Sequence, residues 1–151
     1  MFNKQRLEKL YSGFSRKRIA IVGDLMLDRY FWGSVGRISP EAPVPVVEVE
    51  SESSRLGGAA NVANNIGSLG GVPVMIGVIG NDEGGTLLKK IIEDKGFPTD
   101  GVVVDSSRAT TVKSRVIAHH QHVVRIDRET KQEITPQVAE KLLTVLRKEI
   151  S

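Results

Sequence analysis

Two adjacent glycines, Gly57 and Gly58, open a run of small residues that carries Asn61, Asn64 and Asn65. Glycine lacks the Cβ atom that would keep a ligand away from the backbone, and the first turn of a helix presents N–H groups without intrahelical partners. This segment could therefore donate hydrogen bonds to hydroxyl groups or anions. A tight strand-to-helix turn without a ligand would also explain the glycines. The asparagines favour recognition or capping, because asparagine is a mediocre helix former.

Asp24 and Asp28 follow the apolar run 18–22, which is typical of a short buried strand. Open α/β sheets bind ligands outside the carboxyl ends of their strands, and a carboxylate there can accept hydrogen bonds from two hydroxyl groups. A sugar or another polyol is the ligand that this chemistry indicates. Either aspartate could instead cap the turn that follows the strand.

Lys113 and Arg115 are two residues apart in a predicted strand, so we expect both side chains on the same face. Two cations in this arrangement could hold a phosphate group, Arg115 through two parallel hydrogen bonds and Lys113 as a point charge. The pair could equally be a solvated feature of a surface strand.

Two further segments resemble known kinds of site less well. His119, His120 and His122 lie close together, but no cysteine and no well-spaced carboxylate completes a tetrahedral set, so we predict no metal site. The glycine-rich segment 80–85 matches neither the P-loop nor the dinucleotide-binding pattern. We interpret it as a turn in which Asn81 or Asp82 caps the following helix.

Composition limits the classes of protein to consider. The chain has 151 residues, 40% of them hydrophobic, and no cysteine, which excludes disulfides and thiolate chemistry. Its 21 basic residues are interspersed with 18 acidic ones, so nucleic acid is not an expected partner. No apolar run approaches the length of a membrane span, and the N-terminal residues lack the apolar core of a signal peptide. We therefore expect no membrane association and a cytoplasmic location.

Apolar periodicity predicts an alternating α/β order. The expected elements are a helix at 3–14, strands at 19–22, 30–37 and 44–50, a helix after Gly58, a strand at 74–79, a helix ending near Gly96, strands at 102–104, 110–118 and 122–127, and a helix after Thr135. In the helix after Gly58, the spacing of Val62, Ile66 and Leu69 predicts a stripe that faces the core.

Two β-rich segments interrupt this α/β order and could form a small antiparallel sheet of their own. Pro40, Pro43 and Pro45 lie between the first two of its strands and at the start of the second, which indicates edge strands and turns in this region.

Three motifs occur in order along the chain: GDLMLDRY at 23–30, RISPEAPVPV at 37–46 and GGAANVA at 57–63. With these motifs the chain resembles the ribokinase-like (PfkB) carbohydrate kinases, and among them the heptose 7-phosphate kinases. The resemblance extends from about residue 18 to at least residue 127. The irregular run 37–46 is the part that points to the heptose kinases.

This resemblance implies the N-terminal part of a doubly wound, mostly parallel sheet with a small antiparallel β lid, made by segments of about 29–50 and 110–127. In such kinases the lid covers the sugar, and in many of them two lids join in a homodimer. The resemblance to the heptose kinases implies a sugar phosphate as the substrate. The residues that the resemblance assigns to it are Asp24, Asp28, Arg37, Gly57, Gly58, Asn61, Lys113 and Arg115, with the cations on the phosphate group.

The Gly-Ala-Gly-Asp motif that carries the catalytic aspartate of this family does not occur in residues 1–151. We therefore expect residues 1–151 to be the sugar-binding portion of the kinase domain, without the half that binds ATP and Mg²⁺. Alone it is expected to be inactive and to bind neither. The complete enzyme would phosphorylate the anomeric hydroxyl of heptose 7-phosphate, in the synthesis of ADP-heptose and the lipopolysaccharide core. A non-catalytic module for sugar-phosphate binding or dimerisation is the alternative.

Overall fold

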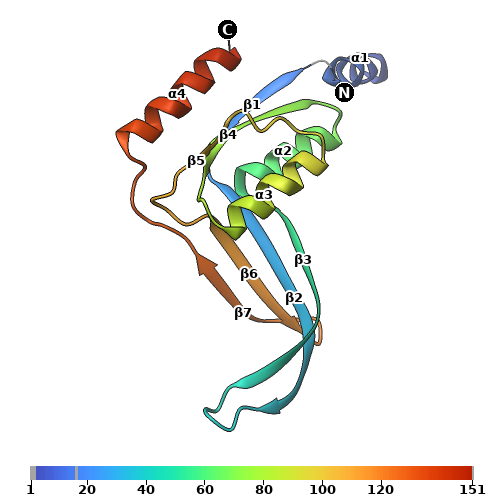
Figure 1. Ribbon diagram of the computed structural model, residues 1–151. Helices are drawn as coiled ribbons and strands as arrows, with labels where there is room; N and C mark the ends of the chain where they lie inside the picture. Colours follow the sequence, from blue (N-terminus) through green and yellow to red (C-terminus); the bar gives the residue numbers. More distant parts are fainter. Residues whose placement is uncertain (1–2, 16, 151) are drawn as a thin grey trace.

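The fold combines two sheets with four helices, in a computed structural model that describes residues 3–15 and 17–150 (Figure 1). The elements in chain order are α1 (Lys4–Phe14), β1 (Arg18–Val22), β2 (Leu25–Ile38), β3 (Pro45–Gly57), α2 (Gly58–Ser68), β4 (Val72–Ile79), α3 (Glu83–Asp94), β5 (Val102–Val104), β6 (Thr111–Ala118), β7 (Gln121–Arg128) and α4 (Pro136–Ile150). One sheet has three strands in the order β1-β4-β5, and the other has four in the order β3-β2-β6-β7. The expected α/β class is confirmed.

The three-stranded sheet is parallel and lies among the helices. Its central strand β4 is a nearly continuous apolar run and is mostly buried, as is typical of a parallel strand with both faces covered. α4 packs along all three strands. Side chains of this sheet, of the adjoining ends of β2 and β3, and of α2 and α3 form one core: Ile21, Leu25, Leu27, Leu56, Ala60, Ala63, Met75, Ile79, Leu88 and Ile92.

The four-stranded sheet projects from this helical part of the molecule (Figure 1). Its outer pairs, β2–β3 and β6–β7, are antiparallel, but the central pair β2–β6 is parallel. The sheet is therefore mixed, and the expectation of a wholly antiparallel sheet is wrong in this respect. The long connection through α2, β4, α3 and β5 brings the chain back to the same end of the sheet before β6 begins, and this produces the parallel pairing.

β2 is longer and more central than expected. It begins at Leu25 and has a partner on each side, whereas edge strands were predicted. The prolines do not interrupt it, because Pro40 and Pro43 lie in the turn after its last residue and Pro45 is the first residue of β3. β3 is an edge strand, as predicted.

The buried side of α2 consists of small residues. Ala60 and Ala63 are fully buried, whereas Val62 and Leu69, predicted to face the core, are 47% and 52% exposed. Ile66 packs partly against the core. α2 lies so close to the sheets that alanine fits where a larger side chain would not, so the most hydrophobic stripe is not the buried one.

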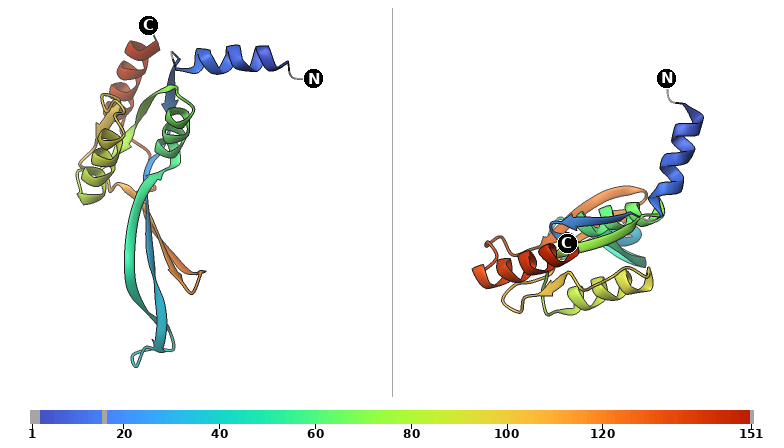
Figure 2. Two further views of the ribbon diagram at one scale, coloured as in Figure 1. Left: turned by 90° about the vertical axis from the view of Figure 1, so that its right-hand side faces the viewer. Right: turned by 90° about the horizontal axis from the view of Figure 1, so that it is seen from above.

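The terminal helices differ in their contacts. α1 begins at its N-cap Asn3, contains no buried residue and extends away from the other elements (Figure 2). α4 begins as predicted, with the Thr135 hydroxyl 3.4 Å from the backbone N–H of Val138, and Val138 is buried. Within residues 3–15 and 17–150, every helix is too short or too polar to cross a membrane.

Candidate functional site

β2 carries alternate side chains into two different environments where it leaves the core. Leu27 is 1% exposed and belongs to the core, while its neighbour Asp28 faces a pocket. Strand pairing places Lys113 beside Asp28 and Arg115 beside Tyr30. Because paired residues of neighbouring strands share a face, these four side chains lie on one face of the four-stranded sheet.

Asp28 and Arg115 form an ion pair with an N–O distance of 2.7 Å. Each side chain is about one fifth exposed, at 20% and 21% respectively. The hydrogen bond to Asp28 raises the pKa of the Arg115 guanidinium above its ordinary value, although partial burial opposes the shift. The pair fixes an acidic and a basic group in a defined geometry on the sheet face.

A pocket of about 470 Å³ lies beside this ion pair. Asp28 and Tyr30 line it from β2, and Arg55 lines it from β3. Asn61 and Asn64 face it from consecutive turns of α2, and Lys95 borders it after the end of α3. A carboxylate, two amides and two cations can together accept and donate hydrogen bonds to a ligand that carries many hydroxyl groups.

Gly57 and Gly58 join the end of β3 to the start of α2. A Cβ atom on Gly57 would lie 2.8 Å from a carboxylate oxygen of Asp28, and one on Gly58 would overlap the carbonyl oxygen of Asp24. Gly58 also has a φ of +54°, which is strained for other residues. The pair is thus required for the close approach of α2 to β2. The N-terminus of α2 lies at this junction and has no side-chain cap.

Asp24 faces a second cavity, of about 540 Å³. This cavity lies where β1 and β4 end, and Gly77, Arg108 and Lys131 also line it. The backbone carbonyl of Asp24 accepts a hydrogen bond of 2.9 Å from the N–H of Ala59. Asp24 and Asp28 therefore border the same junction of β2 with α2 but line two separate hollows.

Arg37 lies at the other end of β2, where it pairs with Val46 and is exposed. Nine residues separate it from Asp28, which corresponds to about 30 Å along a strand. The structure therefore does not bring Arg37 to the pocket of its own chain.

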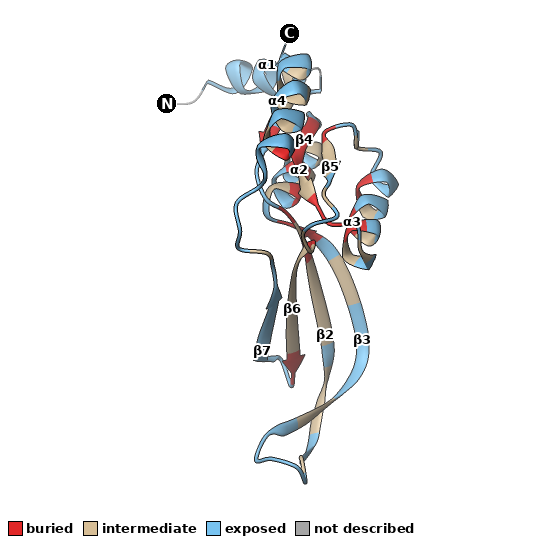
Figure 3. Ribbon diagram, turned by 60° about the vertical axis from the view of Figure 1, so that its left-hand side comes forward, coloured by how far each residue is buried: buried red, intermediate tan, exposed pale blue. Residues whose placement is uncertain are grey.

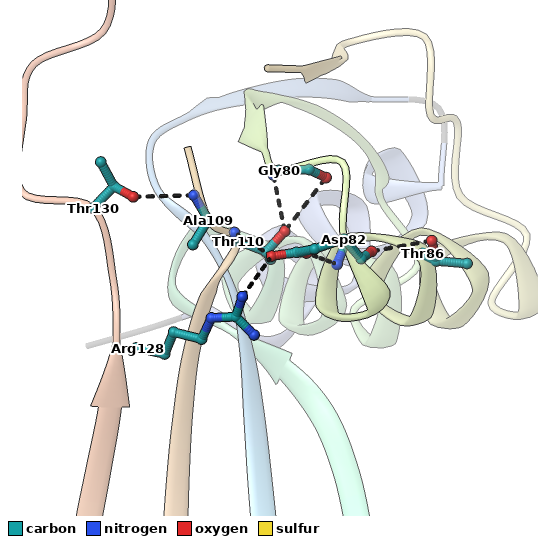
Figure 4. A network of polar contacts seen from close by, with 8 residues as sticks. Gly80, Asp82, Thr86, Ala109, Thr110, Arg128 and Thr130 are labelled. Atoms are coloured by element: carbon teal, nitrogen blue, oxygen red, sulfur yellow. Dashed lines mark hydrogen bonds and ion pairs between the residues drawn. The ribbon is translucent and has the colours of Figure 1, made fainter. Parts of the chain in front are cut away.

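A polar network attaches the four-stranded sheet to the core (Figure 4). One carboxylate oxygen of Asp82 accepts the N–H of Gly85 at 2.9 Å and so caps α3, as predicted. The other accepts the N–H of Thr110 at 3.1 Å and lies 3.7 Å from Arg128. The Thr110 hydroxyl, which is almost fully buried, accepts the N–H of Gly80 at 2.8 Å.

The same network acts on the ionisation of Asp82. Burial on its own raises the pKa of this carboxyl group, but hydrogen bonds from Thr110 and Gly85 and the charge of Arg128 outweigh burial. The pKa of Asp82 therefore lies below its ordinary value, and the carboxylate is the form that holds β6 and β7 against the start of α3.

His119 and His120 occupy the hairpin between β6 and β7 with φ values of 50° and 65°. The Nε2 atom of His119 lies 3.2 Å from the backbone nitrogen of Val35 on β2. Among the residues that the structure describes, no group of three or more His, Cys, Asp or Glu side chains could hold a metal ion.

Sequence analysis did not identify Tyr30, Arg55 or Lys95 as residues of the pocket. Alternation along β2 could have placed Tyr30 on the face of Asp28. Arg55 and Lys95 join the pocket only through the pairing of β2 with β3 and the packing of α3, which local sequence does not reveal.

The fold is that of a carbohydrate kinase of the pfkB family. The model of the pfkB family carbohydrate kinases matches residues 16–148, so the chain belongs to this family.

Two curated relatives indicate a particular branch of the family. The chain is 47% identical over 137 residues to Bifunctional protein HldE of Desulfatibacillum aliphaticivorans, and 49% identical over 131 residues to Bifunctional protein HldE of Citrifermentans bemidjiense. These matches cover 91% and 87% of the chain but only 28% and 27% of the relatives. The chain thus spans less than a third of their length.

A solved structure supports the fold. Ribokinase from Cryptococcus neoformans var. grubii serotype A in complex with ADP matches 82% of this chain and 38% of its own, with a TM-score of 0.55. The sequence identity is 22%, so this likeness concerns the fold.

Proposed function

We propose that this chain forms the sugar-binding portion of a kinase that phosphorylates the anomeric hydroxyl of heptose 7-phosphate. The observation that carries the proposal is the pocket in which Asp28 and Asn61 lie beside the cation Arg115. Groups that bind hydroxyls are thereby adjacent to a group that binds phosphate. Similarity to two proteins named HldE supports the heptose branch of the family.

The proposed roles follow from the chemistry of each group. The Asp28 carboxylate accepts hydrogen bonds from sugar hydroxyls, and the amide of Asn61 both donates and accepts. Gly57 and Gly58 let a ligand approach the first N–H groups of α2. Asp24 accepts a hydroxyl at the other side of the junction. Such contacts orient the reacting hydroxyl, and orientation together with charge stabilisation supplies most of the catalysis in phosphoryl transfer.

Lys113 and Arg115 are proposed to hold the phosphate that the substrate already carries. Arg115 presents a planar fork suited to two phosphate oxygens, and Lys113 adds a charge from the adjacent register position. A phosphate fixed at one end of the sugar determines which hydroxyl lies at the other end. Arg37, about 30 Å away along β2, is not a ligand in this pocket.

ATP is the phosphoryl donor implied by the family. The described residues do not form a site for Mg²⁺, since they contain no suitable cluster of metal ligands, and the sequence holds no P-loop. We therefore derive no step through the nucleotide from these residues. In the proposal, nucleotide binding and the catalytic aspartate belong to the part of the family domain that this chain does not span.

The four-stranded sheet is proposed to act as a lid that excludes water from the sugar, in a cytoplasmic kinase of ADP-heptose and lipopolysaccharide synthesis. Its exposed apolar residues, which include Val49, Val124 and Ile126, would join two lids in a homodimer. Sedimentation velocity at micromolar concentration distinguishes a dimer from a monomer.

A non-catalytic sugar-phosphate-binding or dimerisation module remains the second candidate, because the pocket lies in this chain whereas the family's catalytic motif does not occur in the sequence. Phosphorylation of heptose 7-phosphate above the background of ATP hydrolysis, by the complete protein, distinguishes a kinase from such a module.

Calorimetric titration of the chain with heptose 7-phosphate tests the proposed binding. We expect Asn61→Ala to weaken binding about fivefold, the effect of one neutral hydrogen bond of about 1 kcal/mol. Asn65→Ala is the matched control, because Asn65 lies on the same helix but does not line the pocket. Absence of binding at millimolar ligand, or equal effects of the two variants, would contradict the proposal.

A further inference from the structure

Two arginine side chains approach the ring of Tyr30, one from each strand that flanks β2. The guanidinium carbon of Arg115, on β6, lies 5.1 Å from the ring centroid, and that of Arg55, on β3, lies 5.3 Å from it. Both distances are within the range of cation–π interactions. One aromatic ring therefore keeps two like charges at the edge of the pocket.

Both arginines are also neighbours of Asp28 on the strands that flank β2. Trp32, two residues further along β2, stacks on Tyr30 with ring centroids 6.2 Å apart. Arg55 is the register partner of Asp28, and Arg115 reaches Asp28 through its ion pair. The two arginines thus converge beside the same carboxylate.

The side chains around Asp28 carry more positive charge than the Asp28 carboxylate neutralises. Arg55, Lys113 and Arg115 occupy the positions around Asp28 on the two neighbouring strands. In the described part of the chain, neither Arg55 nor Lys113 forms an ion pair. The next carboxylate, Asp127, already pairs with Arg125. Two positive charges remain in excess, which complements the charge of about −1.5 to −2 on a phosphate monoester.

We infer that Arg55 and Arg115, held together by the ring of Tyr30, form the binding site for the phosphate group of the substrate. The inference rests on the proposed function and adds Arg55 and Tyr30 to the site. Lys113 supplies a third charge from the adjacent position on β6.

The geometry of Arg115 leaves it able to bind a phosphate without losing Asp28. Only its Nη1 atom donates to Asp28 and to the carbonyl of Lys113. Its Nε and Nη2 groups form the edge available to two phosphate oxygens. Asp28 then positions the guanidinium through one nitrogen, while its second oxygen stays available to a sugar hydroxyl.

The decisive variant is Arg55→Gln, which removes a charge from an exposed side chain whose guanidinium lies beside the Tyr30 ring. Titration calorimetry of the chain compares heptose 7-phosphate with the same heptose lacking the phosphate. We expect the dissociation constant for the phosphorylated sugar to rise at least tenfold, and that for the unphosphorylated sugar to change less than twofold. Arg125→Gln, on the same face and one strand further out, is expected to change neither.

A second pair of variants tests the ring. Tyr30→Phe keeps the π face and is expected to preserve the preference for the phosphorylated sugar, whereas Tyr30→Leu releases both arginines and is expected to reduce it. Inorganic phosphate, followed through backbone amide shifts of the cluster, provides a readout that needs no sugar. We expect its binding to weaken in Arg55→Gln as well.

The outcomes separate this inference from the function on which it rests. If wild-type protein binds both sugars equally, or if Arg55→Gln weakens both equally, the phosphate site is overturned while sugar binding stands. If neither sugar binds but inorganic phosphate binds in a manner sensitive to Arg55→Gln, the anion site stands and the proposed substrate fails. An unchanged affinity for inorganic phosphate and for both sugars in Arg55→Gln overturns the inference.

Discussion

The central strand of the three-stranded sheet, β4, is buried, whereas in the four-stranded sheet β7 and much of β3 are exposed and β2 and β6 are mostly of intermediate burial (Figure 3). In β4 nearly every residue is buried, but in β7 every residue is exposed. The first sheet is stabilised mainly by apolar packing, and the second mainly by strand pairing and polar contacts on its faces. The pocket lies where the two meet, so its polar groups have a rigid base without being buried in the core.

The largest effect should come from the core beneath this junction. Leu88 of α3 is fully buried and packs in the core shared by α2 and both sheets. Leu88→Ala removes apolar contacts and leaves a cavity, so we expect a loss of about 3 kcal/mol in the free energy of unfolding in urea. Ile126 on β7 is 57% exposed. Ile126→Thr is therefore the contrasting variant and should change stability by less than about 0.5 kcal/mol. Comparable losses would show that the two sheets are not stabilised differently.

Two glycines at opposite ends of the four-stranded sheet sharpen the comparison. Gly58→Ala places a Cβ against the carbonyl of Asp24 at a φ of +54°, so we expect a loss of about 2 kcal/mol or more. A Cβ on Gly36, at the far end of β2, meets no atom within 4 Å, and Gly36→Ala should be close to neutral. Thermal unfolding of both variants provides the measurement. A neutral Gly58→Ala would mean that the junction relaxes more easily than its close packing suggests.

Local patterns in the sequence predicted most elements of the core. The apolar runs give β1, β4 and β5 because each is short and continuous, and capping residues such as Asp82 and Thr135 place the helix starts within a residue. The orientation of α2 could not be predicted in this way. Its buried side depends on how closely it approaches the sheets, and that distance selects Ala60 and Ala63 over Val62.

The candidate site was only partly predictable for a related reason. Sequence spacing places Lys113 and Arg115 on one face, but it does not show that Arg115 meets Asp28, which is 87 residues away in the chain. That contact depends on the parallel register of β2 with β6, and the contribution of Arg55 depends on the register with β3. The positions of these strands are fixed by the fold as a whole, so no local pattern encodes them.

The attachment between the two sheets predicts an effect of pH. The pKa of Asp82 is lower in the folded protein than its ordinary value of 3.8, so its carboxylate stabilises the fold above that value. This stabilisation is lost as the pH falls through 3.8 towards the lower folded pKa. Asp82→Asn should cost about 1–2 kcal/mol in unfolding free energy at pH 7, since it loses a charged acceptor for two N–H groups.

Urea unfolding between pH 7 and pH 3 checks this prediction. The difference between wild-type protein and Asp82→Asn should shrink as the pH falls below 3.8, because the unfolded state then takes up the Asp82 proton before the folded state does. Asp100→Asn, at an exposed turn, is the control and should follow the wild-type curve. A difference that stays constant with pH would assign the role of Asp82 to its shape and not to its charge.

The smallest effects should distinguish the two faces of β2. Arg115 and Asp28 pair at 2.7 Å with about four fifths of each side chain covered, whereas Arg29 and Glu52 pair at 3.4 Å on the opposite face, with side chains 38% and 62% exposed. We expect Arg115→Gln to cost about 1 kcal/mol in unfolding free energy, because it leaves the largely covered Asp28 without its partner. Arg29→Gln should cost at most about 0.5 kcal/mol, and 0.5 M salt should remove most of that cost because exposed charges are screened. Equal costs for the two variants, with equal sensitivity to salt, would mean that the pocket face is as solvated as the outer face and that its charges are not pre-arranged for a ligand.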